Sequence, residues 1–170
     1  MIPVISVVGK SDSGKTTLLE KIIPELRSRG YRVATVKHDV HGFSLDIPGK
    51  DTWRHSQAGA DVVIISSPAK MATIRKVERE RTLEEITREV TGVDIIITEG
   101  YKRQDRPKLE VFRSEKYDSP LCQLEDQLFA IATDNPDFSG LPAVPVIHWD
   151  DAAALCDLIE ERFLQRTGGE

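Results

Sequence analysis

Residues 7–21 read VVGKSDSGKTTLLEK and join a valine-rich run to an amphipathic stretch through a loop that contains two glycines. The run from Val4 to Val8 is short and almost wholly apolar, as is typical of a strand covered on both faces. After the loop, hydrophobic residues recur at helical spacing, and Gly30 is expected to end the helix. Pro24 interrupts the pattern and is expected to kink the helix. The stretch therefore predicts a strand, a glycine loop and a helix.

The loop matches the pattern GxxxxGK[ST], in which backbone amides surround a phosphate chain. Lys15 is predicted to reach the β- and γ-phosphates, the Thr16 hydroxyl to join a Mg²⁺ shell, and the amide of Thr17 to reach the α-phosphate. An ordinary strand-to-helix turn is the alternative, but this pattern arises by chance in roughly one chain of this length in a hundred or fewer. The predicted nucleotide-binding residues of the loop are Gly9, Lys10, Ser11, Asp12, Ser13, Gly14, Lys15, Thr16 and Thr17.

Strand and helix patterns alternate along the rest of the chain. Strands are expected at residues 31–36, 61–65, 93–98, 108–112, 128–132 and 144–147, with an edge strand at 71–77. Helices are expected at 51–58, with Asp51 as its cap, at 82–90 after a capping box, and after Asp150 or Asp151. The alternation predicts an α/β fold of the three-layer P-loop NTPase type, a mostly parallel twisted sheet with helices on both faces. Residues 1–165 are expected to form a single nucleotide-binding domain and residues 166–170 a frayed tail.

Composition narrows the class of protein. The 170 residues carry a formal net charge of −5, which argues against a general nucleic-acid-binding role. No stretch approaches 18 apolar residues, so no membrane span is expected. The N-terminus has no leader pattern, and the two cysteines have no metal-site spacing. We therefore expect a reduced, cytoplasmic protein.

A P-loop protein needs a carboxylate near its magnesium, usually at the end of a neighbouring strand. Asp94 and Glu99 bracket one predicted strand, and phosphate sites lie at the carboxyl ends of parallel strands. Asp94 is about 16 Å from that end, so Glu99 is the better candidate. The loop after the second strand offers Asp39, Asp46 and Asp51 as well, and the pattern does not rank Asp39 against Asp46.

Base recognition is less clearly encoded. The Asn-Lys-x-Asp motif of regulatory GTPases is absent, because the single asparagine, Asn135, precedes a proline. Asp134 follows a predicted strand at the ligand edge, where its carboxylate would accept hydrogen bonds from guanine N1 and N2. A plain Asp-Asn-Pro turn is an equal alternative.

Four stretches together resemble the MobB proteins of molybdopterin-guanine dinucleotide biosynthesis: GKSDSGKTTL, VKHDVHGFSLDIPGKDTWRHSQAGAD, ITEGYK and ATD. The resemblance runs from Ile2 to about Phe163, and the second stretch is its most specific part. It implies a homodimeric GTP-binding protein with weak intrinsic hydrolysis. It also implies an adapter role beside the guanylyltransferase that joins GMP to molybdopterin, and beside other molybdenum-cofactor assembly proteins. Molybdopterin itself is a further candidate ligand.

Carried onto this chain, the resemblance makes GTP and Mg²⁺ the expected ligands. It favours Asp46 over Asp39 at the magnesium, beside Thr16 and Glu99. Lys15 and Glu99 are the expected catalytic residues of any hydrolysis. Turnover is expected to be slow, because no glutamine lies beside Glu99 and no arginine finger can be named.

Three smaller points stay open at the level of sequence. Lys37 is a candidate for added positive charge near the phosphates. His38 and His41 are candidates for a metal or a pterin phosphate, with ordinary surface histidines as the default. A small-molecule kinase or ligase and a nickel metallochaperone GTPase are the alternative functions. A kinase would need a mobile lid with arginines, but much of the arginine-dense stretch 75–88 lies in a predicted helix, and the chain lacks the histidine-rich arm of a metallochaperone.

Overall fold

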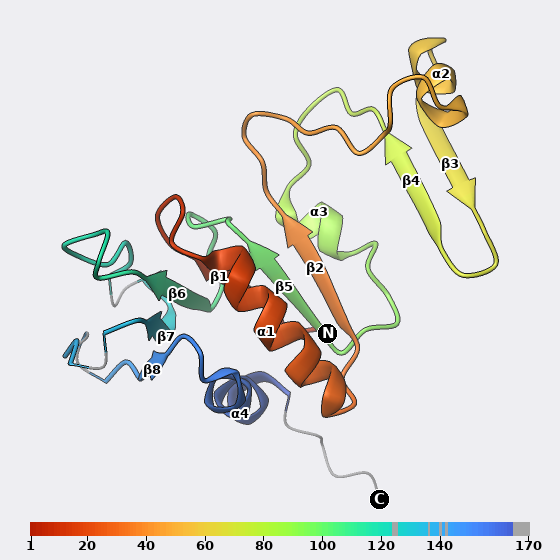
Figure 1. The fold of residues 1–170 in the computed structure, drawn as a ribbon. Helices are drawn as coiled ribbons and strands as arrows, with labels where there is room; N and C mark the ends of the chain where they lie inside the picture. Colours follow the sequence, from red (N-terminus) through yellow and green to blue (C-terminus); the bar gives the residue numbers. More distant parts are fainter. Residues whose placement is uncertain (124–125, 136, 140, 142, 165–170) are drawn as a thin grey trace, which may run out of the picture. The chain divides into compact units, whose positions relative to one another are not determined.

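Six parallel strands form the main sheet of the computed structural model, which describes residues 1–123, 126–135, 137–139, 141 and 143–164 (Figure 1). Their order across the sheet is β2-β5-β1-β6-β7-β8, and every pairing is parallel. The strands are β1 Val4–Val8, β2 Val33–Lys37, β5 Ile95–Glu99, β6 Lys108–Phe112, β7 Leu128–Thr133 and β8 Val146–His148. The predicted α/β class with a mostly parallel sheet is confirmed.

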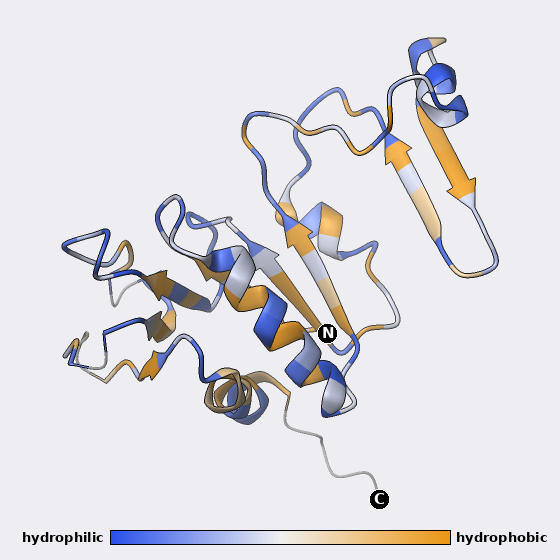
Figure 2. Ribbon diagram, viewed as in Figure 1, coloured by the Kyte–Doolittle hydropathy of each residue, from blue (hydrophilic) through white to orange (hydrophobic). Residues whose placement is uncertain are grey.

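Helices α1 (Lys15–Ser28) and α4 (Ala152–Phe163) pack against each other and share one hydrophobic core with the sheet. The apolar residues of α1 alternate with polar ones along the helix (Figure 2), as the helical spacing predicts. Pro24 lies inside α1 without ending it. Asp151, not Asp150, caps α4, since its side chain accepts a hydrogen bond from the amide of Ala154 at 3.0 Å.

The end of α1 explains why β2 begins later than predicted. Gly30, at φ +91°, donates to the carbonyl of Arg27, and the amide of Tyr31 donates to that of Leu26. This Schellman arrangement places residues 30 and 31 in the helix cap. The prediction of a strand from residue 31 was therefore wrong by two residues.

Contacts divide the described chain into two compact units, one of residues 39–89 and one of the residues before and after them. The smaller unit holds α2 (Asp51–Gln57), β3 (Val62–Ser66), β4 (Met71–Arg75) and α3 (Leu83–Thr87). Strands β3 and β4 pair antiparallel in a sheet of their own. The prediction of one domain over residues 1–165 stays a prediction, and the predicted tail lies outside the described residues.

Helix caps in the smaller unit follow the sequence in one case and depart from it in the other. The capping box of α3 is present in both directions, between Thr82 and Glu85, although the helix ends at Thr87 and not at residue 90. The predicted cap of α2 was wrong. Lys50 is the N-cap residue without a side-chain cap, and Asp51 is already the first helical residue.

Among the described residues, every helix is too short or too polar to span a membrane.

Candidate nucleotide-binding site

The loop between β1 and α1 has the backbone that a phosphate-binding loop requires. Gly9 and Gly14 have φ angles of +151° and +93°, which residues with a Cβ rarely adopt. A Cβ on Gly9 would lie 2.5 Å from the carbonyl oxygen of Val111, and one on Gly14 would lie 3.0 Å from Cζ3 of Trp149. Both positions therefore need glycine for its backbone freedom and for its size.

The loop leads into an open helix N-terminus. Gly14 is the N-cap residue of α1, with no side-chain cap and no acidic residue in the first turn. The first amides of this 14-residue helix can therefore donate to an anion, and the helix dipole favours negative charge there. Ser13 Oγ in the same loop is fully buried and finds no hydrogen-bond partner among the described residues.

Lys15 folds back over the loop that precedes it. Its ammonium donates to the carbonyl oxygens of Gly9 at 3.2 Å and Lys10 at 2.8 Å. Burial lowers the pKa of Lys15 below its ordinary value, against the opposing fields of Glu99 and Asp12. The ammonium thus lies over the loop that the motif assigns to the phosphates.

Glu99 meets the start of α1 because β5 lies next to β1. Glu99 is in register with Val7 of β1, and the amide of Gly100 donates to the carbonyl of Val7 at 3.0 Å. The Thr16 hydroxyl donates to both carboxylate oxygens of Glu99, at 3.0 and 3.1 Å. Hydroxyl and carboxylate oxygens are ligands that Mg²⁺ accepts, so this pair fits the metal side of a P-loop.

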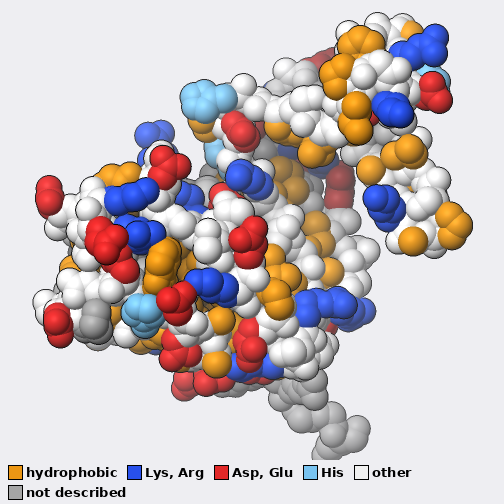
Figure 3. Space-filling view, in the orientation of Figure 1, with side chains coloured by type: hydrophobic (Ala, Val, Ile, Leu, Met, Phe, Trp, Pro, Cys, Tyr) orange, Lys and Arg blue, Asp and Glu red, His pale blue; other side chains and the backbone are white. Residues whose placement is uncertain are grey.

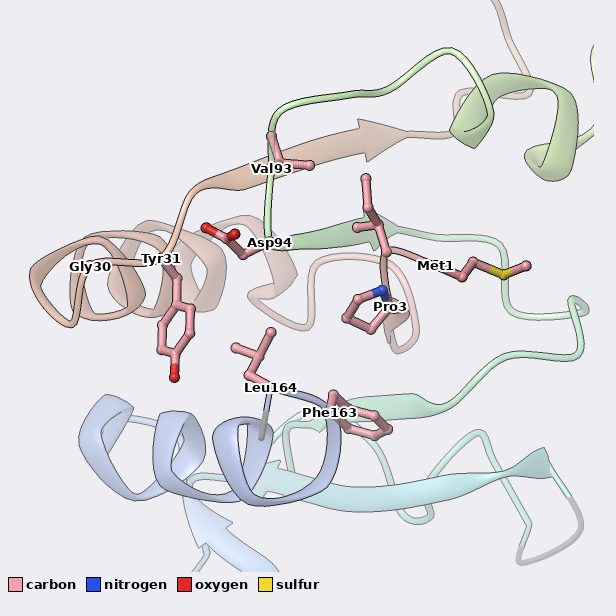
Figure 4. A pocket seen from close by; sticks show the side chains of 9 residues that line it. Met1, Pro3, Gly30, Tyr31, Val93, Asp94, Phe163 and Leu164 are labelled. Carbon is pink, nitrogen blue, oxygen red and sulfur yellow. The ribbon is translucent and has the colours of Figure 1, made fainter. Parts of the chain in front are cut away.

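Asp94 lies at the opposite end of β5. Its carboxylate accepts hydrogen bonds from the backbone amide of Arg32 at 2.7 Å and from the guanidinium of the same residue. Near it, residues 1–3, 30–31, 93–94 and 163–164 line a hollow of about 530 Å³ (Figure 4). This hollow lies at the amino ends of the strands, away from Glu99. It is thus separate from the P-loop end of the sheet.

Lys37 ends β2 as Glu99 ends β5, and the two residues are register partners. The ammonium of Lys37 lies 3.3 Å from Oε1 of Glu99. The Lys37 side chain is 62% exposed, whereas that of Glu99 is 14% exposed. Lys37 therefore lies at the open side of the carboxylate.

A segment after β6 braces the outside of the P-loop, a feature that no motif predicts. Three hydrogen bonds join them: Tyr117 Oη to the carbonyl oxygen of Ser11 at 2.6 Å, Lys116 Nζ to that of Asp12 at 3.2 Å, and Lys10 Nζ to that of Ser119 at 2.9 Å. The Lys10 ammonium also lies 4.9 Å from the centre of the Tyr117 ring. The predicted loop residues 10–12 thus have structural partners on their outer side.

Asp134 lies where the strand pattern predicts, directly after β7. One carboxylate oxygen accepts from the amide and hydroxyl of Ser114, at 2.9 and 3.1 Å, and the other accepts from Arg113 Nε at 2.9 Å. Burial alone would raise the pKa of Asp134, but these hydrogen bonds lower it below its ordinary value. The Arg113 guanidinium also lies 4.3 Å from the ring centre of Trp149. Asp134 is therefore linked to Gly14 through Arg113 and Trp149.

Asp39 and Asp46, the metal-ligand candidates from the loop after β2, both lie in the smaller unit. Asp46 Oδ1 accepts from the Thr52 hydroxyl at 2.8 Å, and Oδ2 has no hydrogen-bond partner among the described residues. Asp39 accepts from the amide of His41 at 2.9 Å. His38, in the larger unit, stacks on Tyr101 with ring centres 4.7 Å apart. Within the described residues, no three His, Cys, Asp or Glu side chains gather as a metal site.

Comparison with known proteins agrees with this geometry. The family model described as "MobB: Molybdopterin guanine dinucleotide synthesis protein B" matches residues 4–134. The molybdopterin-guanine dinucleotide biosynthesis adapter protein of Escherichia coli is 32% identical over 99% of this chain and 97% of its own length. The protein of the same name from Haemophilus influenzae is 36% identical over 79% of this chain and 76% of its own length.

Solved structures give the same answer. The crystal structure of Bacillus subtilis MobB covers 99% of this chain and matches over its full length, with a TM-score of 0.76 and 25% sequence identity. A crystal structure of molybdopterin-guanine biosynthesis protein B covers 93% of this chain and 98% of its own length, with a TM-score of 0.70 and 28% identity. The sequence match and the shared fold span the P-loop and the strand that ends in Glu99, and the chain belongs to the MobB family.

Proposed function

We propose that this protein binds GTP with Mg²⁺ at the P-loop and acts as an adapter in the biosynthesis of molybdopterin guanine dinucleotide. The observation that carries the nucleotide site is the hydrogen bond from Thr16 to Glu99 at the open N-terminus of α1. It brings together a hydroxyl and a carboxylate that lie 83 residues apart, at the sheet edge where P-loop proteins hold their metal. The adapter role follows the names of the E. coli and H. influenzae relatives.

The metal site proposed here is built from oxygen ligands. Thr16 and Glu99 would hold Mg²⁺ together with phosphate oxygens, and Asp46 is kept as a further proposed ligand because of the family resemblance of its loop. The bound ion would neutralise phosphate charge, while Lys15 and the loop amides hold the phosphates in place.

Guanine selection is assigned to Asp134. Its lowered pKa keeps the carboxylate ionised, as an acceptor for guanine N1 and N2 must be. The amide and hydroxyl of Ser114 hold Oδ1, and among the described residues Oδ2 accepts one hydrogen bond, from Arg113. Hydrolysis is proposed to be weak, with Lys15 and Glu99 as its assigned residues, because the sequence has no glutamine beside Glu99 and no arginine finger can be named.

A homodimer is proposed, with the β3–β4 hairpin as the contact surface. Each of its strands pairs only with the other in the described chain, so both have a free edge. Ile64, Ile65 and Met71 are 60%, 57% and 69% exposed, and Figure 3 shows hydrophobic side chains on the surface of the smaller unit. Exposed apolar strand edges favour pairing with another chain. The other proposed partners are a guanylyltransferase, molybdopterin and further proteins of molybdenum-cofactor assembly, and the proposed location is the cytoplasm.

Binding of GTP, GDP and ATP, each with and without Mg²⁺, tests the nucleotide proposal. We expect GTP to bind more tightly than ATP and its affinity to rise with Mg²⁺. Equal binding of GTP and ATP would remove the guanine assignment, and no binding of any nucleotide would remove the P-loop assignment. Co-purification with a molybdopterin guanylyltransferase tests the adapter role separately.

A further inference from the structure

Lys37, the last residue of β2, places a cation at the P-loop side of the sheet. This cation is not part of the P-loop motif. Lys37 is in register with Glu99, and Glu99 is in register with Val7 of β1. Register partners on parallel strands point to the same face, and Val7 belongs to the core cluster that contains the buried residues of α1. The side chain of Lys37 is therefore directed to the face that carries α1 and the start of the nucleotide site.

Charges of both signs meet at this point. Glu99 and Asp12 favour the charged form of Lys15, and the fields of Lys37 and Lys102 oppose them. Lys37 finds its charge partner in Glu99, at 3.3 Å. An ion pair in which one side chain is 62% exposed is weak, so the ammonium can exchange a carboxylate for a phosphate at little cost.

The order of the strands indicates which phosphate Lys37 meets. The P-loop amides and Lys15 would hold the β-phosphate, and Thr16 and Glu99 would hold a metal ion that neutralises phosphate charge. Glu99 ends the strand next to β1, and Lys37 ends the strand one further out. Going across the sheet from β1 through β5 to β2, Lys37 therefore lies beyond the groups that hold the β-phosphate.

We propose that Lys37 recognises the γ-phosphate, so that this single side chain makes the protein distinguish a nucleoside triphosphate from a diphosphate. This inference rests on the proposed nucleotide site. The inference adds to the proposed site a residue that senses whether a triphosphate or a diphosphate is bound. Lys37 is a specificity-determining residue in this account, because its interaction exists in the triphosphate complex and not in the diphosphate complex.

Equilibrium binding of a non-hydrolysable GTP analogue and of GDP, in Mg²⁺, tests the proposal with three variants. Lys37→Gln removes the charge, and we expect it to weaken triphosphate binding at least about tenfold while GDP binding changes less than about twofold. Lys37→Arg keeps the charge and is expected to stay within about threefold of the unaltered protein for both ligands. Lys70→Gln makes the same chemical change at the β3–β4 turn and is expected to alter neither.

The outcomes separate this inference from the proposed function. If the unaltered protein binds neither ligand, the P-loop proposal fails and Lys37 has no phosphate to recognise. If the unaltered protein binds both and Lys37→Gln weakens both equally, Lys37 only orients Glu99 and the sensor proposal is wrong. An unchanged affinity ratio overturns it as well. Repeating the measurement with the ATP analogue and ADP makes the result independent of base preference, and Lys37→Met replaces the glutamine variant if that one does not fold.

Discussion

The hydroxyl of Thr16 donates to both carboxylate oxygens of Glu99, at 3.0 and 3.1 Å. This contact joins the first turn of α1 to the carboxyl end of β5, and it exists because β5 pairs with β1 directly before the P-loop. A carboxylate at this place can serve a metal beside the phosphates. A carboxylate at the other end of the same strand cannot, which gives the first prediction a built-in control.

Glu99→Gln is expected to weaken the Mg²⁺ dependence of GTP binding more than Asp94→Asn does. The amide can still accept a hydrogen bond from Thr16, so the fold is kept while the charge is lost. Asp94 lies at the amino end of β5 and pairs with Arg32, so its substitution alters a contact remote from the site. Titrating Mg²⁺ at fixed GTP measures the two effects. The reverse order would contradict the assignment of the metal to the carboxyl end of the sheet.

Lys15→Ala is expected to abolish tight binding of both GTP and GDP. Among the described residues the ammonium donates to two loop carbonyls, those of Gly9 and Lys10, so its removal leaves the core intact. Calorimetric titration of the nucleotide, with circular dichroism to confirm the fold, checks this. Lys70→Ala, at the β3–β4 turn, serves as the matched lysine control. Unchanged affinity in Lys15→Ala would mean that the loop does not hold the phosphates.

These two predictions rest on the backbone of the loop and the direction of β5, which can be predicted from the sequence because both are local. The P-loop pattern constrains backbone angles and reach within nine residues, and strand direction alone separates Glu99 from Asp94. The capping box at Thr82 likewise needs only four consecutive residues.

The features that were not predicted depend on residues far apart in the chain. Trp149 lies over Gly14, and Tyr117 bonds to Ser11, across more than 100 residues in each case. The separate β3–β4 sheet was missed because periodicity identifies a strand without naming its partner. The cap of α2 was misassigned because an aspartate suits the first helical turn as well as the cap.

Asp134→Ala is expected to reduce the preference for GTP over ATP. Its carboxylate also orients Arg113, so a loss caused only by a misplaced Arg113 has to be distinguished. Arg113→Ala is the comparison, because it removes that partner and leaves the carboxylate in place. The GTP-to-ATP affinity ratio should fall in Asp134→Ala and be largely kept in Arg113→Ala. A fall of equal size in both variants would assign the effect to the Arg113–Asp134 pair and not to base reading.

Ile64→Lys is expected to shift the protein from dimer to monomer. A charged side chain at an exposed apolar position of the hairpin would be buried without a partner in a hairpin-to-hairpin contact, at a cost that rises steeply with desolvation. Sedimentation equilibrium of the variant measures the change. Val40→Lys places the same charge on an apolar residue that is 74% exposed outside the hairpin, and it should leave the mass unchanged. A monomer before any substitution would remove the dimer proposal.

Gly14→Ala is expected to lower nucleotide affinity at least about tenfold, for two separable reasons. The φ of +93° strains any residue with a Cβ, at about 1–2 kcal/mol, and the new methyl group would lie 3.0 Å from Trp149. Gly42→Ala shares the first cause without the second, since its φ is +83° and nothing lies within 4 Å of the added carbon. Gly42→Ala should lower the free energy of unfolding measured in urea without changing GTP affinity.

A second experiment separates the two causes. Adding Trp149→Ala to Gly14→Ala removes the close contact, and a partial recovery of affinity would assign that share of the loss to the indole. No recovery at all would show that Trp149 does not constrain the loop.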